Sequence, residues 1–108
     1  MPKLIIQEGY RQTDEFQIPE GETLVGRNTD NDVVLTSKGV SRVHLRVTRE
    51  DESVTIADLD SRNGTFLNSF PVQEPTPLKH RDVIQLGDSM LVYEEADSEV
   101  EDAKLAGE

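Results

Sequence analysis

Short stretches rich in β-branched and large apolar residues recur along residues 1–94. Several of them alternate apolar with polar residues, as Leu45 and Val47 do with Arg46 and Thr48, which is the period of a half-buried strand. Turn-forming residues separate them at spacings of about 8–12 residues, and no stretch keeps a helical period. The pattern predicts an all-β chain of two packed sheets, with strands over residues 4–6, 16–18, 23–25, 33–35, 44–48, 53–57, 65–67, 83–86 and 90–93.

The C-terminal segment, residues 95–108, differs from the rest of the chain in composition. It carries six acidic residues against one basic residue, and its only large apolar side chains are Val100 and Leu105. So little apolar surface cannot offset the entropy lost on ordering the segment. We therefore predict one β-sandwich domain over residues 1–94, followed by an acidic disordered tail or linker over residues 95–108, with a short helix over residues 98–105 as the alternative.

Composition excludes several classes of protein. The chain has no cysteine, which rules out disulfides, a thiolate zinc site and a cysteine nucleophile. Its 22 acidic and 11 basic residues give a net charge of −11, which opposes binding to a nucleic-acid backbone. No apolar run approaches the ~20 residues that span a bilayer, and the N-terminus does not have the pattern of a signal peptide. We expect a cytoplasmic protein without nucleic-acid or membrane partners.

Two predicted loops carry unusual chemistry for such an acidic chain. The segment from Arg27 to Arg49 contains five basic and two acidic residues, and it includes the loop over residues 37–42. The second loop, residues 58–65, is dense in Asp, Ser, Asn and Gly, whose side chains and backbone favour turns. Loops at one end of a sandwich are common sites for binding residues, because the rigid strands position them.

The donors on these loops suit a phosphate group. Arginine presents a planar fork of donors that pairs with phosphate oxygens and remains charged, while a hydroxyl and an amide add neutral donors. The alternative is that each arginine pairs with one of the many acids or simply ends a strand. The candidate donors are Arg27, Ser41, Arg42, Arg62 and Asn63.

Three spaced motifs make the chain resemble a forkhead-associated (FHA) domain, a phosphothreonine-recognition module. They are Gly26-Arg27, then Ser41-Arg42-Val43-His44, then Asp58-Leu59-Asp60-Ser61-Arg62-Asn63-Gly64-Thr65-Phe66-Leu67-Asn68, and the likeness extends roughly from Leu4 to Tyr93. The resemblance implies a sandwich of about eleven short strands whose loops at one end hold a phosphothreonine peptide. It also implies a partner protein that carries phosphothreonine, namely a Ser/Thr kinase or its substrate.

Carried over position by position, the resemblance assigns roles to individual residues. Arg27 and Ser41 would contact the phosphate, Arg42 would be a further cationic donor, and Asn63 would bind the peptide main chain. Arg62 stands where the family often has a small residue beside the phosphothreonine. The residues that would support the binding loops are Gly26, His44, Gly64, Thr65 and Asn68.

The sequence departs from the family pattern at two predicted turns. Ser69 and Arg81 stand where the family commonly has glycine. The proline-rich stretch over residues 70–77 is expected to be a loop with Phe70 packed on the sandwich.

A phospho-independent interaction or dimerisation domain is the alternative function. We expect no enzyme, cofactor or metal site, because Ser41 and His44 lack a third orienting group and Asp58 with Asp60 supply too few ligands.

Overall fold

The structure is a computed structural model, and it describes residues 2–8 and 11–95, without the side chains of residues 11–13. It contains eleven strands and no helix in this range. The strands are β1 (Pro2–Glu8), β2 (Arg11–Gln17), β3 (Gly21–Gly26), β4 (Val33–Val34), β5 (Leu45–Glu50), β6 (Ser53–Asp58), β7 (Phe66–Leu67), β8 (Phe70–Pro71), β9 (Thr76–Pro77), β10 (Val83–Leu86) and β11 (Ser89–Glu95).

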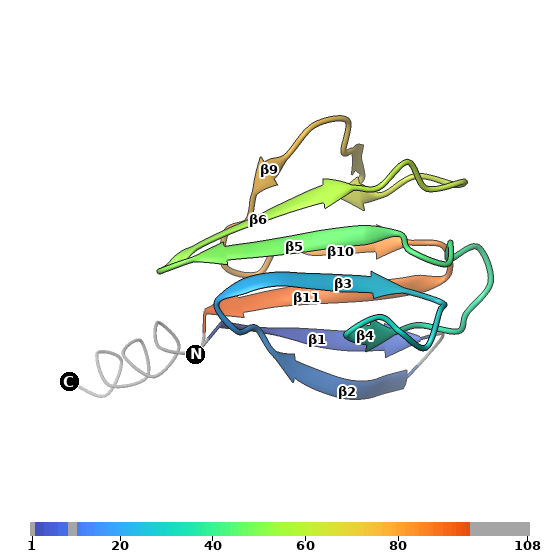
Figure 1. Cartoon of the computed structure of the whole chain (residues 1–108), viewed down its shortest axis with the longest axis horizontal. Coiled ribbons are helices and arrows are strands. Elements are labelled where there is room, and N and C mark those ends of the chain that lie inside the picture. The colour runs from blue at the N-terminus through green and yellow to red at the C-terminus, as the bar shows by residue number, and fades with distance from the viewer. Residues whose placement is uncertain (1, 9–10, 96–108) are drawn as a thin grey trace.

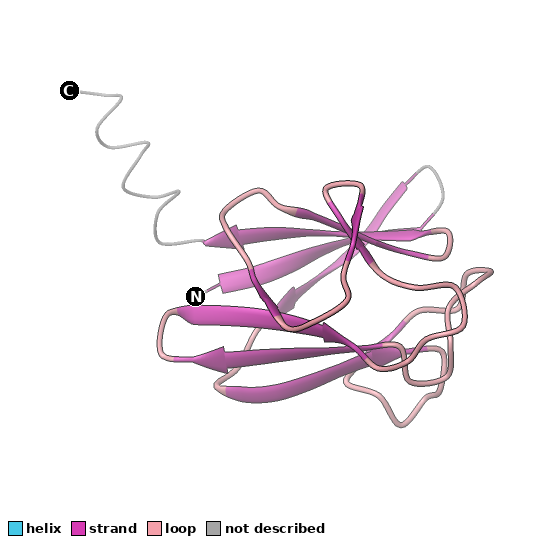
Figure 2. Cartoon of the chain, turned by 90° about the horizontal axis from the view of Figure 1, so that it is seen from above, coloured by secondary structure: helices cyan, strands magenta, loops and turns pink. Residues whose placement is uncertain are grey.

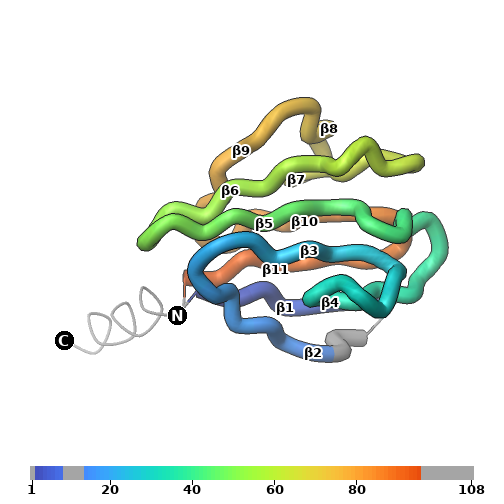
Figure 3. Tube along the Cα trace, in the orientation of Figure 1, coloured from blue at the N-terminus to red at the C-terminus, as the bar shows by residue number. Residues whose placement is uncertain are grey.

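The strands form two sheets that pack face to face, as the sequence predicts (Figure 1). One sheet has six strands in the order β2-β1-β11-β10-β7-β8, and the other has five in the order β4-β3-β5-β6-β9. Seen from above in Figure 2, the two layers are joined by long loops that gather at one end of the sandwich. The chain trace in Figure 3 shows that this end lies opposite the beginning of β1 and the end of β11.

The core lies between the sheets and follows the alternating pattern in the sequence. Leu45 and Val47 of β5 and Ile84 and Leu86 of β10 belong to one core cluster, and all four side chains are fully buried. Each such side chain contributes about 1.5–3 kcal/mol when it is removed from water. The sandwich is thus a rigid frame for the loops at its end.

The short edge strands were the least predictable elements. Residues 70–77, expected to be a loop, contain β8 and β9, each of which pairs at the outer edge of its sheet. Pro71 and Pro77 fit there because an edge strand needs no donor on its outer side. Likewise β2 begins at Arg11, well before the predicted start at Phe16, because its first half is polar and gives no apolar pattern.

Phe70 does not pack on the sandwich as expected. Its side chain is 74% exposed, since it sits on a two-residue strand at the open edge of the six-stranded sheet, where no further strand covers it. Its partner in the hairpin, Leu67, packs against the core.

The β7–β8 hairpin carries backbone strain at Ser69. Asn68 and Ser69 both have positive φ values, of 49° and 78°, which is the geometry of a two-residue turn that favours Asn followed by Gly. We expect Ser69→Gly to stabilise the fold by about 0.5–1 kcal/mol, measured by chemical denaturation, because glycine adopts this φ without a Cβ penalty. The matched variant Ser69→Ala keeps the penalty and is expected to give no gain; equal stabilisation by both variants would contradict the turn assignment.

The last strand, β11, extends one residue into the segment predicted to be the tail. β11 continues through Glu95, whose backbone N–H donates to His80 Nδ1 over 3.1 Å. The remainder of the predicted tail, residues 96–108 with the alternative helix, lies outside the described residues. Within the described part of the chain, no helix is long and apolar enough to cross a membrane.

Candidate functional site

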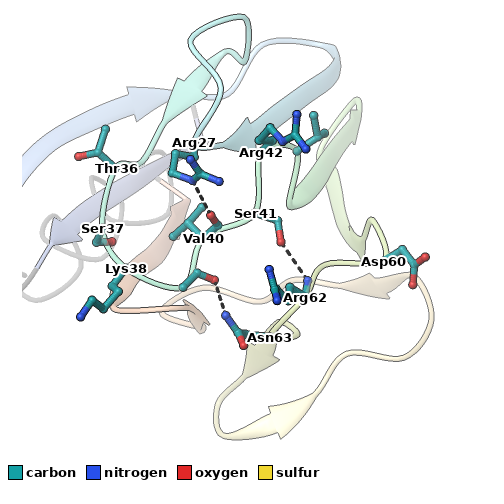
Figure 4. A pocket seen from close by; sticks show the side chains of 12 residues that line it. Arg27, Thr36, Ser37, Lys38, Val40, Ser41, Arg42, Asp60, Arg62 and Asn63 are labelled. Atoms are coloured by element: carbon teal, nitrogen blue, oxygen red, sulfur yellow. Dashed lines mark hydrogen bonds between the residues drawn. The ribbon is translucent and has the colours of Figure 1, made fainter.

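A cleft of about 730 Å³ opens among the loops at the end of the sandwich (Figure 4). Its walls come from three segments: the end of β3, the loop between β4 and β5, and the loop between β6 and β7. All five predicted phosphate and peptide contacts line it, namely Arg27, Ser41, Arg42, Arg62 and Asn63, together with Thr36, Ser37, Lys38, Gly39, Val40, Val43 and Asp60. The fold therefore gathers donors from distant parts of the sequence at one place.

Arg27 and Ser41 are held side by side by the backbone. The N–H of Arg27 donates to the Ser41 carbonyl over 2.9 Å, and the Arg27 side chain donates from Nε to the Val40 carbonyl over 3.1 Å. This second bond orients the guanidinium and leaves its two terminal nitrogens for other acceptors. The side chain of Arg27 is exposed, so an external anion can reach it.

Gly26 permits this close approach of the two segments. A Cβ built on Gly26 would lie 2.2 Å from the carbonyl oxygen of Arg42 and 2.8 Å from its carbonyl carbon. That oxygen also accepts hydrogen bonds from Asn28 N over 3.1 Å and from Asn31 Nδ2 over 2.7 Å. The predicted supporting role of Gly26 thus has a steric basis, because no side chain fits between β3 and the Arg42 backbone.

The Ser41 hydroxyl is positioned as a donor toward the cleft. Its oxygen accepts the backbone N–H of Arg62 over 2.9 Å, which links the two binding loops. A hydroxyl that accepts one bond still has its own hydrogen to donate. Figure 4 shows this bond at the centre of the cleft, with Arg27 on one side of Ser41 and Arg62 on the other.

His44 ties both loops together from beneath. The buried ring accepts the N–H of Ser41 at Nδ1 over 3.0 Å, so Nε2 carries the hydrogen that is donated to the Gly64 carbonyl over 2.9 Å. Both ring nitrogens are therefore engaged with the backbone, and the contact to residue 41 involves its N–H rather than its hydroxyl. This geometry offers no imidazole base to a Ser41 nucleophile.

The Asp58 carboxylate organises the second loop. It accepts the hydroxyls of Ser61 over 2.5 Å and Thr65 over 2.6 Å, as well as the N–H of Ser61 over 3.1 Å. Burial acts to raise the pKa of Asp58, but the hydrogen bonds from Ser61 and Thr65 outweigh it and hold the pKa below the ordinary 3.8. Gly64 completes the turn with a φ of 85°, which glycine adopts without strain.

The lowered pKa of Asp58 predicts an acid-dependent contribution to stability. Because the folded-state pKa lies below the unfolded value, the ionised carboxylate stabilises the fold above about pH 4, and this contribution is lost as the pH falls further. Asp58→Asn is expected to lower the free energy of unfolding at pH 7, with a smaller difference from the unaltered protein at pH 3. Denaturation at both pH values tests this, and a gap of the same size at both would contradict it.

The loop over residues 36–40 rests on the six-stranded sheet. Asp88 N donates to the Lys38 carbonyl over 2.9 Å, and the added Cβ of Gly39 would come within 2.9 Å of the Gly87 Cα. Ser37 and Ser89 share a hydrogen bond between their hydroxyls. Asn63 Nδ2 donates to the Gly39 carbonyl over 3.0 Å and so joins this loop to the β6–β7 loop.

The cations around the cleft have no acidic partner among residues 2–8 and 11–95. The lysine and arginine ion pairs there involve Lys3, Arg49 and Arg81, all outside the cleft. By contrast, Arg27, Lys38, Arg42 and Arg62 line the cleft with only one acid, Asp60. In a chain of net charge −11, this local excess of positive charge favours an anionic ligand.

Comparison with known proteins identifies the family. The FHA domain model matches residues 23–87, which include every wall of the cleft. The chain belongs to the FHA domain family. Among solved structures, an FHA domain from a study of phosphothreonine-dependent FHA interactions superimposes with a TM-score of 0.80 at 34% identity, covering 87% of this chain and 95% of that one.

The FHA relatives include proteins with regulatory names. The FHA domain-containing protein FhaA of Mycobacterium tuberculosis is 42% identical over 89 residues, and the glycogen accumulation regulator GarA of the same species is 31% identical over 90. The matched regions cover 82% and 83% of this chain but only 16% of FhaA and 55% of GarA. The FhaA FHA domain has been solved in complex with the intracellular domain of Rv3910, and it superimposes with a TM-score of 0.79 at 34% identity, covering 86% of this chain and 99% of that one.

Two residues of the six-stranded sheet that support a loop of this FHA cleft, Glu8 and Ser89, were not predicted from the sequence. Glu8 of β1 accepts the Thr36 N–H over 3.1 Å and also contacts the Ser89 hydroxyl over 3.4 Å. Ser89 lies 52 residues from Ser37 and 81 from Glu8, so no local motif announces these contacts. Asn68, expected to support the binding loops, instead bonds to Asp82 and Val83, and so fixes the β7–β8 hairpin to β10.

Proposed function

We propose that this FHA domain is a phosphopeptide-binding module whose cleft recognises phosphothreonine in a partner protein. The observation that carries the proposal is a set of cations, none paired with an acid of the described residues, that line one cleft with Ser41 at the end of the sandwich. A phosphothreonine brings a charge of about −1.5 to −2, which matches this surface. The partner would be a Ser/Thr kinase or one of its substrates, and a cytoplasmic location fits such signalling.

The geometry of the cleft supports individual roles for its donors. The terminal nitrogens of Arg27 and the hydroxyl of Ser41 donate to the phosphate oxygens, and Arg42 adds a further cation. Asn63 is positioned by its hydrogen bond to the Gly39 carbonyl. Its second Nδ2 hydrogen and its Oδ1 then hydrogen-bond the peptide main chain beside the phosphothreonine. Each phosphate contact from a charged donor contributes about 1.5–3 kcal/mol.

Binding then requires the phosphate, while the peptide residues that flank the phosphothreonine determine the affinity. Three such contacts total about 5–9 kcal/mol, against an association cost of about 4 kcal/mol or more. The remaining affinity comes from peptide residues that contact the loop over residues 37–40. A binding role also agrees with the position of His44, whose ring supports both loops and leaves no nitrogen to activate Ser41.

Titration calorimetry with a matched pair of peptides tests the proposal. The phosphothreonine peptide is expected to bind, and its unphosphorylated form to bind at least about 100-fold more weakly. Affinity is also expected to fall below about pH 6, where the phosphate gains its second proton. Equal affinity for the two peptides would refute phosphate recognition.

The exposed Phe66 and Met90, which flank Gln85 on the outer face of the six-stranded sheet, favour a second candidate function, namely a phospho-independent interaction surface on that face. Sedimentation with and without the phosphopeptide separates the two. Self-association that ignores the peptide would support this second function.

A further inference from the structure

Asn63 precedes Gly64, and an Asn-Gly pair can react with itself. The glycine nitrogen attacks Cγ of the asparagine side chain, and a cyclic imide forms as ammonia leaves. Glycine favours ring closure because it has no Cβ to hinder the attack. The other three asparagines of the chain precede bulkier residues, in the pairs Asn28-Thr29, Asn31-Asp32 and Asn68-Ser69. Asn63 is also exposed at the cleft, so water reaches it.

The fold holds both of the groups that would react. The Gly64 N–H, which must lose its proton before the nitrogen attacks, donates to Ser61 Oγ over 3.0 Å. Ser61 is itself fixed by Asp58, which accepts its N–H over 3.1 Å and its hydroxyl over 2.5 Å. At the other end, Asn63 Nδ2, the group that leaves, donates to the Gly39 carbonyl over 3.0 Å (Figure 4). This bond is exposed to water and exchanges with it, so the folded loop slows the reaction but does not block it.

The charges around Asn63 favour the reaction. The Gly64 nitrogen becomes negative when it loses its proton, and nearby positive charge stabilises an anion. Arg62 is the preceding residue, and Lys38 precedes the Gly39 whose carbonyl accepts the Asn63 bond. Both cations line the cleft together with Asn63. The lining that suits a phosphate therefore also promotes loss of the Asn63 amide.

We propose that Asn63 is a deamidation site and that its conversion irreversibly ends peptide binding by the cleft. Hydroxide takes the Gly64 N–H proton, the electron pair of that nitrogen forms the bond to Cγ, and Nδ2 leaves as ammonia with a proton from water. Water then opens the imide. Breaking the bond from nitrogen to Cγ gives aspartate, and breaking the bond to the main-chain carbonyl gives isoaspartate. The net reaction consumes water and releases ammonia, mole for mole, without oxidation or reduction.

Either product damages the contact that Asn63 makes with the peptide, and this consequence rests on the proposed function. Aspartate has no N–H to donate to the Gly39 carbonyl or to the peptide main chain, and its negative charge repels the phosphate. Isoaspartate also lengthens the main chain of the loop by a methylene. A bound phosphopeptide hydrogen-bonds the same amide, so an occupied cleft protects Asn63 from deamidation.

Incubation of the folded protein at mildly alkaline pH tests the chemistry without a ligand. Peptide mapping by mass spectrometry and methylation by an isoaspartyl methyltransferase measure the products. Conversion is expected at Asn63 and at no other asparagine, roughly tenfold more slowly than in the urea-unfolded chain, because two hydrogen bonds of about threefold each oppose it.

A serine variant tests the protection by the fold. Ser61→Ala removes the acceptor of the Gly64 N–H and is expected to accelerate conversion about threefold. Ser69→Ala removes a serine hydroxyl from the neighbouring β7–β8 turn and should leave the rate at Asn63 unchanged. Equal acceleration by both variants would contradict the role of Ser61.

Calorimetry with a phosphothreonine peptide tests the consequence for binding. The binding-competent fraction is expected to fall in step with conversion, and Asn63→Asp to weaken binding about tenfold or more. Asn63→Gln forms the larger ring far more slowly, so it should keep its starting affinity through the same incubation. Saturating phosphopeptide is expected to slow conversion about threefold or more, whereas its unphosphorylated form should not.

The outcomes separate this inference from the proposed function. If Asn63 stays intact in the folded protein while the unfolded chain converts fully, or if other asparagines convert as fast, the deamidation site is refuted. If Asn63→Asp binds the phosphopeptide as tightly as the unaltered protein, loss of binding by deamidation is refuted. If the unaltered protein binds no phosphopeptide, the proposed function fails, and the ligand-free incubation still decides whether Asn63 deamidates.

Discussion

Replacing Arg27 with alanine is expected to weaken binding of a phosphothreonine peptide by about 100-fold or more, which abolishes discrimination against the unphosphorylated form. The variant removes the guanidinium that the Val40 carbonyl holds through Nε in the wall of the cleft that Ser41 also lines. Ser41→Ala is expected to act in the same direction with a smaller loss, since it removes one neutral donor. Calorimetric titration with the matched peptide pair measures both effects.

These losses should occur without unfolding. Arg27 is exposed and its side chain makes a single hydrogen bond to the backbone, so the melting temperature of Arg27→Ala should change by only a few degrees. Lys79→Ala is a matched control, because it removes one positive charge far from the cleft walls. If Lys79→Ala weakened the peptide as much as Arg27→Ala, the effect would reflect overall charge rather than the assigned contact.

Gly26→Ala is expected to give the largest loss of stability. Its Cβ would lie 2.2 Å from the Arg42 carbonyl oxygen, and backbone atoms cannot swing aside as a side chain would. We expect a loss of about 3 kcal/mol, or a drop of roughly 10–20 °C in melting temperature, measured by thermal denaturation. The same clash displaces the backbone of the Ser41–Arg42 loop, so the phosphopeptide affinity of the folded fraction should also fall.

Gly21→Ala is the comparison for Gly26→Ala. Gly21 has a φ of 98° but open space where a Cβ would be added. Its replacement therefore reports backbone strain alone, at about 1 kcal/mol, and should leave peptide binding unchanged. A loss of stability from Gly26→Ala no larger than that from Gly21→Ala would show that the two segments can separate, contrary to the rigid coupling described above.

The loops that form the cleft are hydrogen-bonded or packed against both sheets of the sandwich. His44, on the five-stranded side, fastens Ser41 and Gly64, while Gly87 and Ser89 of the other sheet support the loop over residues 36–40. Held loops lose little conformational entropy when a ligand binds, which favours affinity from few contacts. This explains how a small domain with a strongly negative net charge can present a preformed anion site.

Much of the candidate site was predictable because its residues are marked by local chemistry. Arg27, Ser41 and Asn63 stand in short motifs, and the cationic segment contrasts with the acidic rest of the chain. Lys38 was predicted only as one of the basic residues of that segment, because no local motif indicates that its loop lines the cleft. Its position depends on the contact between Gly39 and Gly87, which lie on different segments.

By itself, the sequence determined the all-β class, the two-sheet arrangement and the donors of the cleft, because alternation and turn residues are local properties of the chain. Only the tertiary structure decided which loops meet, that Glu8 and Ser89 support one of them, and that Phe70 lies on an open edge. The physical reason is that these contacts depend on which strands become neighbours in the sheets. Strand order joins β1 to β11 and leaves β8 at the edge, and no periodicity along the chain encodes that order.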